Sequence, residues 1–434
     1  MAVGNRSAFS PMTELCYPHL GLFSYTLTEG EENTNSLTFI PEDATDRESI
    51  EGFNYLCNLG DTEGLLTLYF IADEPHHHPQ PLSYLHKLKQ QINTNKIHQK
   101  TEQISPDKKI GKTWIILGIL PSFLPDSKID CIAQEAAKIF DFDQQILLEP
   151  QKFMGATIYE LWTPPDRWQD LNKKNNHLVI ILYPDKEKLD TFDQFKQDWM
   201  RLFYYRNKIL WAYNNSVQTP MREFLKKNLL PSDFTITQQL NPYQSGELEV
   251  DLDQLRQLLK KNYLIAKHYS QCLIFLEVQL QTLQTNFYNY QERRNSLVKK
   301  AQVLGTTDDN LLQSFIEIPA QRYQLQLEKD IAALSPGLRG RDTFINTIRG
   351  MVDIEQAKSD RNLNYIIAGA SIGLATSGVT ATILSTQVYQ PENTTSERIS
   401  VFQGFLRSLF PIFLIMGIGI IIWDRRRQAR KDKR

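Results

Sequence analysis

An uncharged stretch of 30 residues separates Arg361 from Glu392 near the end of this 434-residue chain. A helix needs roughly 20 apolar residues to cross the hydrocarbon core of a bilayer. Tyr365–Val388 has this length, and a second apolar segment, Val401–Trp423, follows after a short polar linker. Its one charge, Arg407, lies near its start, where a long side chain reaches the interface. We therefore predict a transmembrane hairpin; the alternative is a pair of buried core helices.

The charges that flank this hairpin predict its orientation. The segment after Trp423, DRRRQARKDKR, has seven basic and two acidic residues, whereas the linker Tyr389–Ser400 has two glutamates and one arginine. The more basic side of a hairpin faces the cytoplasm. The first 30 residues lack the basic and then apolar pattern of a signal peptide. We expect a multi-pass protein of the cell (inner) membrane with a cytoplasmic N-terminus and a cytoplasmic C-terminus.

The two predicted spans differ in polarity, because the first has seven Ser and Thr hydroxyls and the second is rich in Ile, Leu and Phe. Spacing of three and four places five residues on one face of the first span as pore-lining candidates in a homo-oligomer: Gly369, Gly373, Thr376, Thr380 and Gln387. Small residues also let two helices approach closely. Tight packing of the first span against the second is therefore the alternative.

A long helical region precedes the hairpin. Leu252–Leu297 repeats apolar residues at spacings of three and four, which predicts a long helix with a coiled-coil-like seam. Gly305 is expected to end this helix, and Pro319 is expected to kink the next one. The tripeptide at 335–337, Ser-Pro-Gly, predicts a break. The last helix is then expected to begin near Asp342 and to continue into the membrane.

The N-terminal 240 residues alternate short apolar runs with amphipathic segments, which is typical of an α/β domain. Strands are expected at Gly21–Leu27, Leu65–Ile71, Thr113–Leu117, Ala156–Leu161 and Leu178–Tyr183. Helices are expected at Leu82–Ile97, Lys128–Phe140 and Lys188–Val217, and polar loops at 29–50 and 97–110.

The predicted fold class is an α+β membrane protein. A cytoplasmic α/β domain spans 1–240, a long-helix connector with coiled-coil character spans 245–361, a two-helix transmembrane hairpin spans 362–424, and a basic cytoplasmic tail spans 425–434.

Composition and motifs argue against several functions. The chain has 48 Lys and Arg against 50 Asp and Glu, and this balance argues against a nucleic-acid partner. The four cysteines lie far apart without a CxxC pair. Gly111-Lys112-Thr113 resembles the end of a phosphate-binding loop, but Pro106 occupies the position of its first glycine. The histidines at 76–78 are adjacent, so their rings point in different directions. We expect no enzymatic activity.

The order of these parts resembles the CorA-type magnesium transporters, in which a cytoplasmic α/β domain and long helices lead into the first of two spans. The resemblance implies an oligomeric cation channel or divergent metal-ion transporter, gated by its cytoplasmic domain, with the lipid bilayer and further copies as partners. It also implies a divalent cation such as Mg²⁺. The family has a Gly-Met-Asn signature after the first span, whereas Ser385–Asn393 contains no Gly-x-Asn. Glu392 and Asn393 are pore-mouth candidates, as oxygen ligands for a hydrated cation.

Three acidic residues before the first span, Asp353, Glu355 and Asp360, are candidate ligands for a divalent cation between subunits. The alternative is a solvated helix face. A second class of function also stays open. The protein would then be a membrane-anchored sensor or a defence or signalling effector, whose cytoplasmic domain binds a partner or small ligand without transport.

Overall fold

The computed structural model describes residues 14–28, 35–40, 50–71, 78–121, 124–142, 149–162, 176–218, 220–229 and 252–356. The chain divides into two compact units. Unit 1 comprises Met1–Leu229 and Phe275–Pro336, and unit 2 comprises Leu230–Ile274 and Gly337–Arg434. Two boundaries between the units fall inside continuous helices, α9 (Leu252–Leu304) and α11 (Leu325–Gln356). The connector predicted at 245–361 therefore contributes residues to both units.

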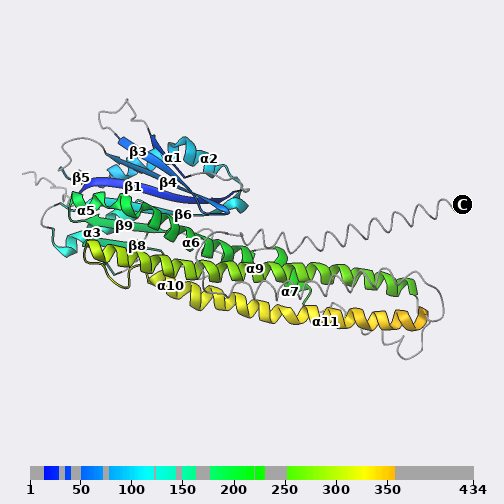
Figure 1. The fold of residues 1–434 in the computed structure, drawn as a ribbon. Coiled ribbons are helices and arrows are strands. Elements are labelled where there is room, and N and C mark those ends of the chain that lie inside the picture. The colour runs from blue at the N-terminus through cyan, green and yellow to red at the C-terminus, as the bar shows by residue number, and fades with distance from the viewer. Residues whose placement is uncertain are drawn as a thin grey trace, which may run out of the picture. The chain divides into compact units, whose positions relative to one another are not determined.

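Unit 1 contains a mixed nine-stranded sheet with the order β2-β3-β4-β1-β6-β9-β8-β7, and β5 pairs with β1 (Figure 1). The strands are β1 (Glu14–Leu27), β2 (Ser36–Ile40), β3 (Ile50–Asn58), β4 (Thr62–Ile71), β5 (Gln80–Pro81), β6 (Lys109–Ile119), β7 (Gln151–Phe153), β8 (Ala156–Leu161) and β9 (Leu178–Tyr183). The pair β6 and β9 is parallel, and the other described pairs are antiparallel.

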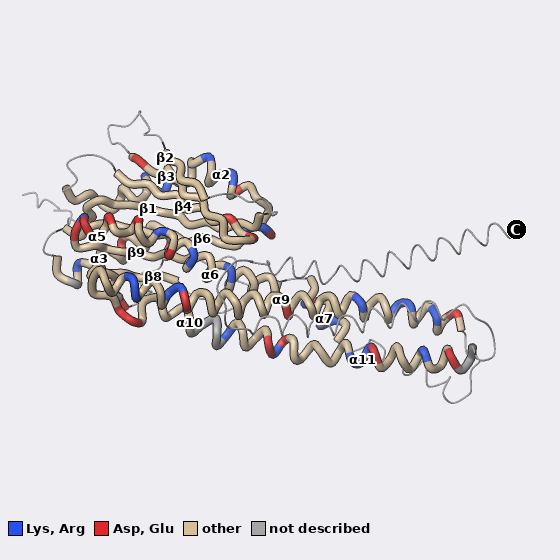
Figure 2. The backbone as a smooth tube through the Cα atoms, in the orientation of Figure 1, with Lys and Arg blue, Asp and Glu red and all other residues tan. Residues whose placement is uncertain are grey.

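Seven helices of unit 1 lie between or after the strands in the described sequence, apart from α9 and α11. They are α1 (Tyr84–Thr94), α2 (Lys96–Glu102), α3 (Asp126–Lys138), α5 (Lys186–Asp190), α6 (Phe192–Gln218), α7 (Pro220–Lys227) and α10 (Ser314–Ile318), with a 3-10 turn at Pro106–Lys108 and a π-helical segment at Pro319–Gln324. Figure 2 shows that charged residues occur mainly on helices and at strand ends, whereas most of the sheet is uncharged.

The central strands of the sheet are buried on both faces, and neighbouring residues along them point to opposite sides. Ile115 packs in the cluster that includes Trp199 and Phe203 of α6, and also residues of α9 and α10. The next residue, Ile116, packs in the cluster that includes α1 and α3. Every residue of β8 and β9 is buried, which explains their continuous apolar sequences.

Unit 2 contains a seam between the first part of α9 and the second part of α11. Its core comprises Leu255, Leu259, Ala266, Ile345, Ile348 and Val352. Within this unit Arg341 is 2% exposed, and its Nη1 donates to Asn262 Oδ1 at 3.2 Å. The seam confirms the apolar spacing predicted for the first half of α9.

The five predicted strands and three predicted helices of the N-terminal region each overlap an observed element, and the predicted end of α9 at Gly305 is confirmed. Two predicted polar loops are wrong. The range 29–50 contains β2, which pairs with β3, and the range 97–110 contains most of α2. Asn95 begins α2, since its side chain accepts from the backbone N–H groups of Ile97 and His98.

The break predicted at 335–337 is also wrong, because α11 passes through Pro336 and begins at Leu325 instead of Asp342. Pro336 lies on the exposed side of the helix, where the carbonyl left without its N–H partner can reach water, while Leu334 is buried. The hydroxyl of Ser335 donates to the Ile331 carbonyl at 2.7 Å. The irregularity expected at Pro319 takes the form of the π-helical segment.

Among the residues that the structure describes, no helix is long and apolar enough to cross a membrane. The predicted spans, Tyr365–Val388 and Val401–Trp423, lie outside those residues. The transmembrane hairpin and its orientation therefore stay predictions.

Candidate functional site

The residues predicted for a pore lie outside the described part of the chain: Gly369, Gly373, Thr376, Thr380, Gln387, Glu392 and Asn393. Asp360 also lies outside it, and the structure describes the helix but not the side chain at Glu355. Asp353 is 54% exposed and pairs with Arg349, whose Nε is 3.9 Å from its carboxylate. The described residues contain no group of three or more His, Cys, Asp or Glu side chains placed to hold a metal ion.

The most unusual chemistry of unit 1 is a buried polar group on one face of the sheet, which we call the Arg206 cluster. Its members are Thr113 of β6, Glu160 of β8, His177 before β9, Arg206 and Asn207 of α6, and Ser314 at the start of α10. All are buried except Ser314, which is exposed at the edge. The cluster therefore joins three strands, the helix that covers them, and the short helix before α11.

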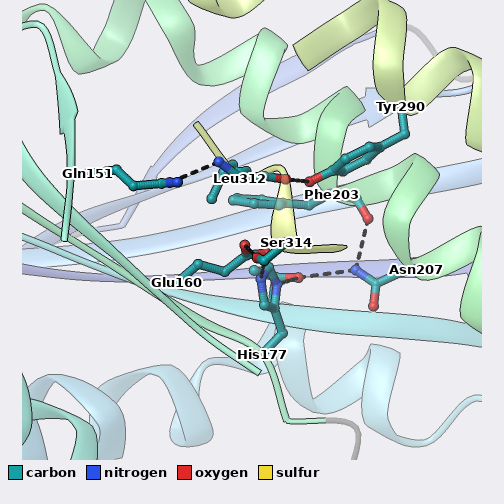
Figure 3. A network of polar contacts seen from close by, with 9 residues as sticks. Gln151, Glu160, His177, Phe203, Asn207, Tyr290, Leu312 and Ser314 are labelled. Carbon is teal, nitrogen blue, oxygen red and sulfur yellow. Dashed lines mark hydrogen bonds and ion pairs between the residues drawn. The ribbon is translucent and has the colours of Figure 1, made fainter. Parts of the chain in front are cut away.

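Hydrogen bonds connect five of these side chains in a fixed order (Figure 3). Ser314 Oγ donates to Glu160 Oε2 at 2.9 Å, and His177 Nε2 lies 3.1 Å from Glu160 Oε1. On the other side of the ring, His177 Nδ1 lies 3.0 Å from Thr113 Oγ1, which accepts from Asn207 Nδ2 at 3.1 Å. This order assigns the proton of a neutral His177 to Nε2, since Nδ1 accepts from the hydroxyl.

The electrostatics of the cluster favour a neutral histidine and an ionised glutamate. Burial and the nearby charge of Arg206 lower the pKa of His177 to about 4 against the opposing effect of Glu160. Burial raises the pKa of Glu160, but hydrogen bonds from His177 and Ser314 and the charge of Arg206 outweigh it, so the pKa of this carboxyl is lowered. Neutral His177 and ionised Glu160 therefore form a donor–acceptor pair at neutral pH.

Arg206 is 0% exposed, and burial lowers the pKa of its guanidinium to about 10 against the opposing effect of Glu160. It is therefore charged at neutral pH. Its Cζ lies 4.8 Å from the ring centroids of both Trp162 and Phe315, which are 5.1 Å apart. These three points form a nearly equilateral triangle, so the rings are neighbours and cover one side of the guanidinium. A desolvated cation–π contact contributes about 2 kcal/mol.

Hydrogen-bond donors are in excess around this guanidinium. Among the described residues, Nε, Nη1 and Nη2 of Arg206 have no acceptor, and Trp162 Nε1 and the Tyr323 hydroxyl also lack a partner. Tyr323 is close enough to Arg206 for each charge to affect the pKa of the other. The carboxylate of Glu160 offsets the charge, but both its oxygens accept from other groups. A buried donor without an acceptor costs about 1–3 kcal/mol, and more when it is charged.

The segment that precedes α11 is held tightly beside the cluster. Gln151 Oε1 accepts from the backbone N–H of Leu312 at 2.9 Å, and the Tyr290 hydroxyl donates to the Leu312 carbonyl at 3.3 Å (Figure 3). Tyr213 of α6 stacks on Tyr323 of the π-helical segment with ring centroids 4.2 Å apart. A change in side-chain positions within the cluster would therefore directly affect the segment that leads into α11.

Sequence reasoning missed the Arg206 cluster, because its members are far apart in the chain and follow no local motif. Two signals were present. Glu160 is the one charge in the apolar run Ala156–Leu161, and Arg206 lies in the middle of a helix rich in aromatic residues. A charge inside a buried element needs a partner.

Comparisons with known proteins offer no further guide, since no family model, no curated relative and no solved structure matches this chain.

Proposed function

We propose that the protein is an integral membrane protein that works as an oligomeric cation channel or divergent metal-ion transporter, with unit 1 on the cytoplasmic side as its gating domain. The observation that carries the proposal is α11. It is a continuous helix through Pro336 over 32 described residues, and the last of these, Gln356, lies nine positions before Tyr365, the start of the first predicted span. A helix that continues across this interval connects unit 1 directly to the membrane.

The first turns of α11 are attached to unit 1 by polar contacts. Arg222 of α7 forms an ion pair with Asp330, and Gln284 of α9 donates to Glu328 at 3.2 Å. Leu327 is 1% exposed. A rearrangement in unit 1 would therefore move α11, and a rigid helix passes such a movement to the element that follows it. The hydroxyl-rich face of the predicted first span would line the path of the ion.

The proposal is tested by purifying the full chain in detergent, measuring its oligomeric mass, and recording cation flux in liposomes with and without Mg²⁺. A ring of several subunits that carries flux supports it. Thr376→Leu and Thr380→Leu should each abolish flux without changing the mass. Thr382→Leu, which lies off the candidate pore-lining face at helical spacing, should leave flux close to wild type. A monomer or dimer without flux contradicts it.

The second candidate is a membrane-anchored sensor or effector without transport. The Arg206 cluster favours it, because excess donors in unit 1 are suited to binding a ligand, whether or not the hairpin conducts. Under this hypothesis, a chain whose first span is replaced by a generic apolar helix should keep its ligand binding. The same replacement abolishes the activity of a channel.

A further inference from the structure

Another buried arginine of unit 1, Arg294, has hydrogen-bond acceptors. Arg294 donates to the backbone carbonyls of Leu311 and Asp309, so its charge has neutral oxygen acceptors. Arg206 lies deeper, and the described residues offer its three nitrogens no acceptor at all. The described residues therefore provide acceptors for one buried guanidinium and none for a more deeply buried one.

Two neutral donors accompany Arg206 and have the same deficit. Trp162 Nε1 and the Tyr323 hydroxyl are buried without a partner among the described residues. Trp162 is in contact with the guanidinium, and Tyr323 reaches the cluster from the π-helical segment. Five donor atoms of three neighbouring side chains, from the end of β8, α6 and the π-helical segment, thus have no acceptor among the described residues.

We infer that the Arg206 cluster is a binding site for a small oxyanion, a carboxylate or phosphate group, that accepts hydrogen bonds from the Arg206 guanidinium, Trp162 Nε1 and the Tyr323 hydroxyl. A guanidinium presents parallel N–H bonds in one plane, a geometry that fits two oxygens of a carboxylate or phosphate. Trp162 and Phe315 occupy one side of it, so the ligand binds at the remaining nitrogen edges.

A ligand would reach the Arg206 cluster near the start of α10, and its binding would affect the segment that follows this helix. Ser314 is exposed and its hydroxyl bonds to Glu160, so the cluster lies one residue from solvent at the start of this helix. A ligand that binds Arg206 and Tyr323 together connects α6 to the segment before α11. The inference concerns unit 1 alone and does not depend on transport by the hairpin.

The test measures thermal unfolding of the full chain in detergent while chloride is replaced by acetate or by inorganic phosphate at constant ionic strength. The preparation is also denatured and the released anions are analysed by ion chromatography, which detects a ligand retained through purification. We expect a saturable rise in Tm with acetate or with phosphate, and the one that acts identifies the group. No rise with either anion, together with no stoichiometric release, overturns the inference.

Variants separate a specific site from a general salt effect. Arg206→Gln should abolish the rise in Tm, whereas Arg201→Gln, on the same helix outside the cluster, should retain it. An equal rise in Arg206→Gln and wild type overturns the inference. Because Arg206→Gln can fail to fold, Trp162→Phe and Tyr323→Phe remove one donor each and keep the ring. Each should weaken binding about fivefold, the effect of losing one hydrogen bond; unchanged affinity in both overturns the inference.

Discussion

Units 1 and 2 each bury an arginine almost completely, and they treat it differently. In unit 2, Arg341 crosses the seam between α9 and α11 and donates to Asn262. In unit 1, Arg206 contacts two aromatic rings and has a carboxylate nearby, but no acceptor among the described residues. A helix seam needs a polar pair only to fix its register. A buried charge whose donors lack acceptors among the described residues instead needs an explanation, and the oxyanion site inferred above provides one.

The strongest test of this contrast removes the carboxylate that offsets Arg206. Glu160→Gln keeps the shape of the side chain but leaves the guanidinium without an opposite charge. We expect the free energy of unfolding to fall by about 3–5 kcal/mol, as when one partner of a buried ion pair is removed. Urea denaturation measures this, with Glu51→Gln on the exposed side of β3 as the control. A loss below about 1 kcal/mol would mean that Arg206 is already hydrated.

The acid sensitivity of unit 1 should depend on His177. Its folded pKa of about 4 lies below the ordinary value of 6.5. Between these two pH values the unfolded chain binds a proton that the folded chain does not, so stability falls as pH decreases through this window. A shift of this size corresponds to about 3 kcal/mol.

His177→Gln should remove that part of the pH dependence, measured as the difference in unfolding free energy between pH 7 and pH 4.5. His86→Gln, exposed on α1, serves as the control. Glu160 adds a separate acid effect at lower pH, because its lowered pKa means that stability is lost once this carboxylate is protonated. An identical pH profile in His177→Gln and wild type would contradict a buried neutral histidine.

Unit 2 provides the matching test. Arg341→Met leaves the Asn262 amide oxygen without this donor inside the seam, at an expected cost of about 1–3 kcal/mol. Adding Asn262→Leu should recover part of the loss, because an apolar pair replaces both partners. The double-mutant cycle measures the coupling between the two residues. Additive losses would show that the pair is not a structural contact of the seam.

The smallest expected effect concerns Pro336. Proline in a helix interior costs about 3 kcal/mol relative to alanine, but the exposed position of Pro336 allows water to satisfy part of the loss. Pro336→Ala should therefore stabilise the protein by about 1 kcal/mol, seen as a small rise in Tm. A destabilised variant would mean that α11 depends on the bend that proline introduces.

Much of unit 1 could be predicted from local sequence, because β8 and β9 are short, continuous apolar runs. The edge strand β2 could not. Phe39 is 74% exposed, and the strand is defined by pairing with β3, which leaves no periodic signal. The helix break predicted at Pro336 was wrong for a related reason. Proline usually interrupts a helix, but the packing of residues on the buried side of α11 outweighs this local preference.

The Arg206 cluster could not be predicted either. Glu160 and Arg206 are 46 positions apart, and only the sheet topology brings their elements together. The pore candidates were predicted from polarity and helical spacing and are untested, since Thr376, Thr380 and Gln387 lie outside the described residues. Sequence patterns report on burial, whereas a site depends on which buried elements meet.

The π-helical segment at Pro319–Gln324 has a rotational consequence for everything that follows it. A π turn contains one residue more than an α turn, and one residue corresponds to about 100° around a helix axis. Deleting a single residue from this segment would turn the apolar side of α11, with Leu327 and Leu334, towards solvent. The segment therefore sets the angular phase of α11, and with it the face that the first predicted span presents to its neighbours.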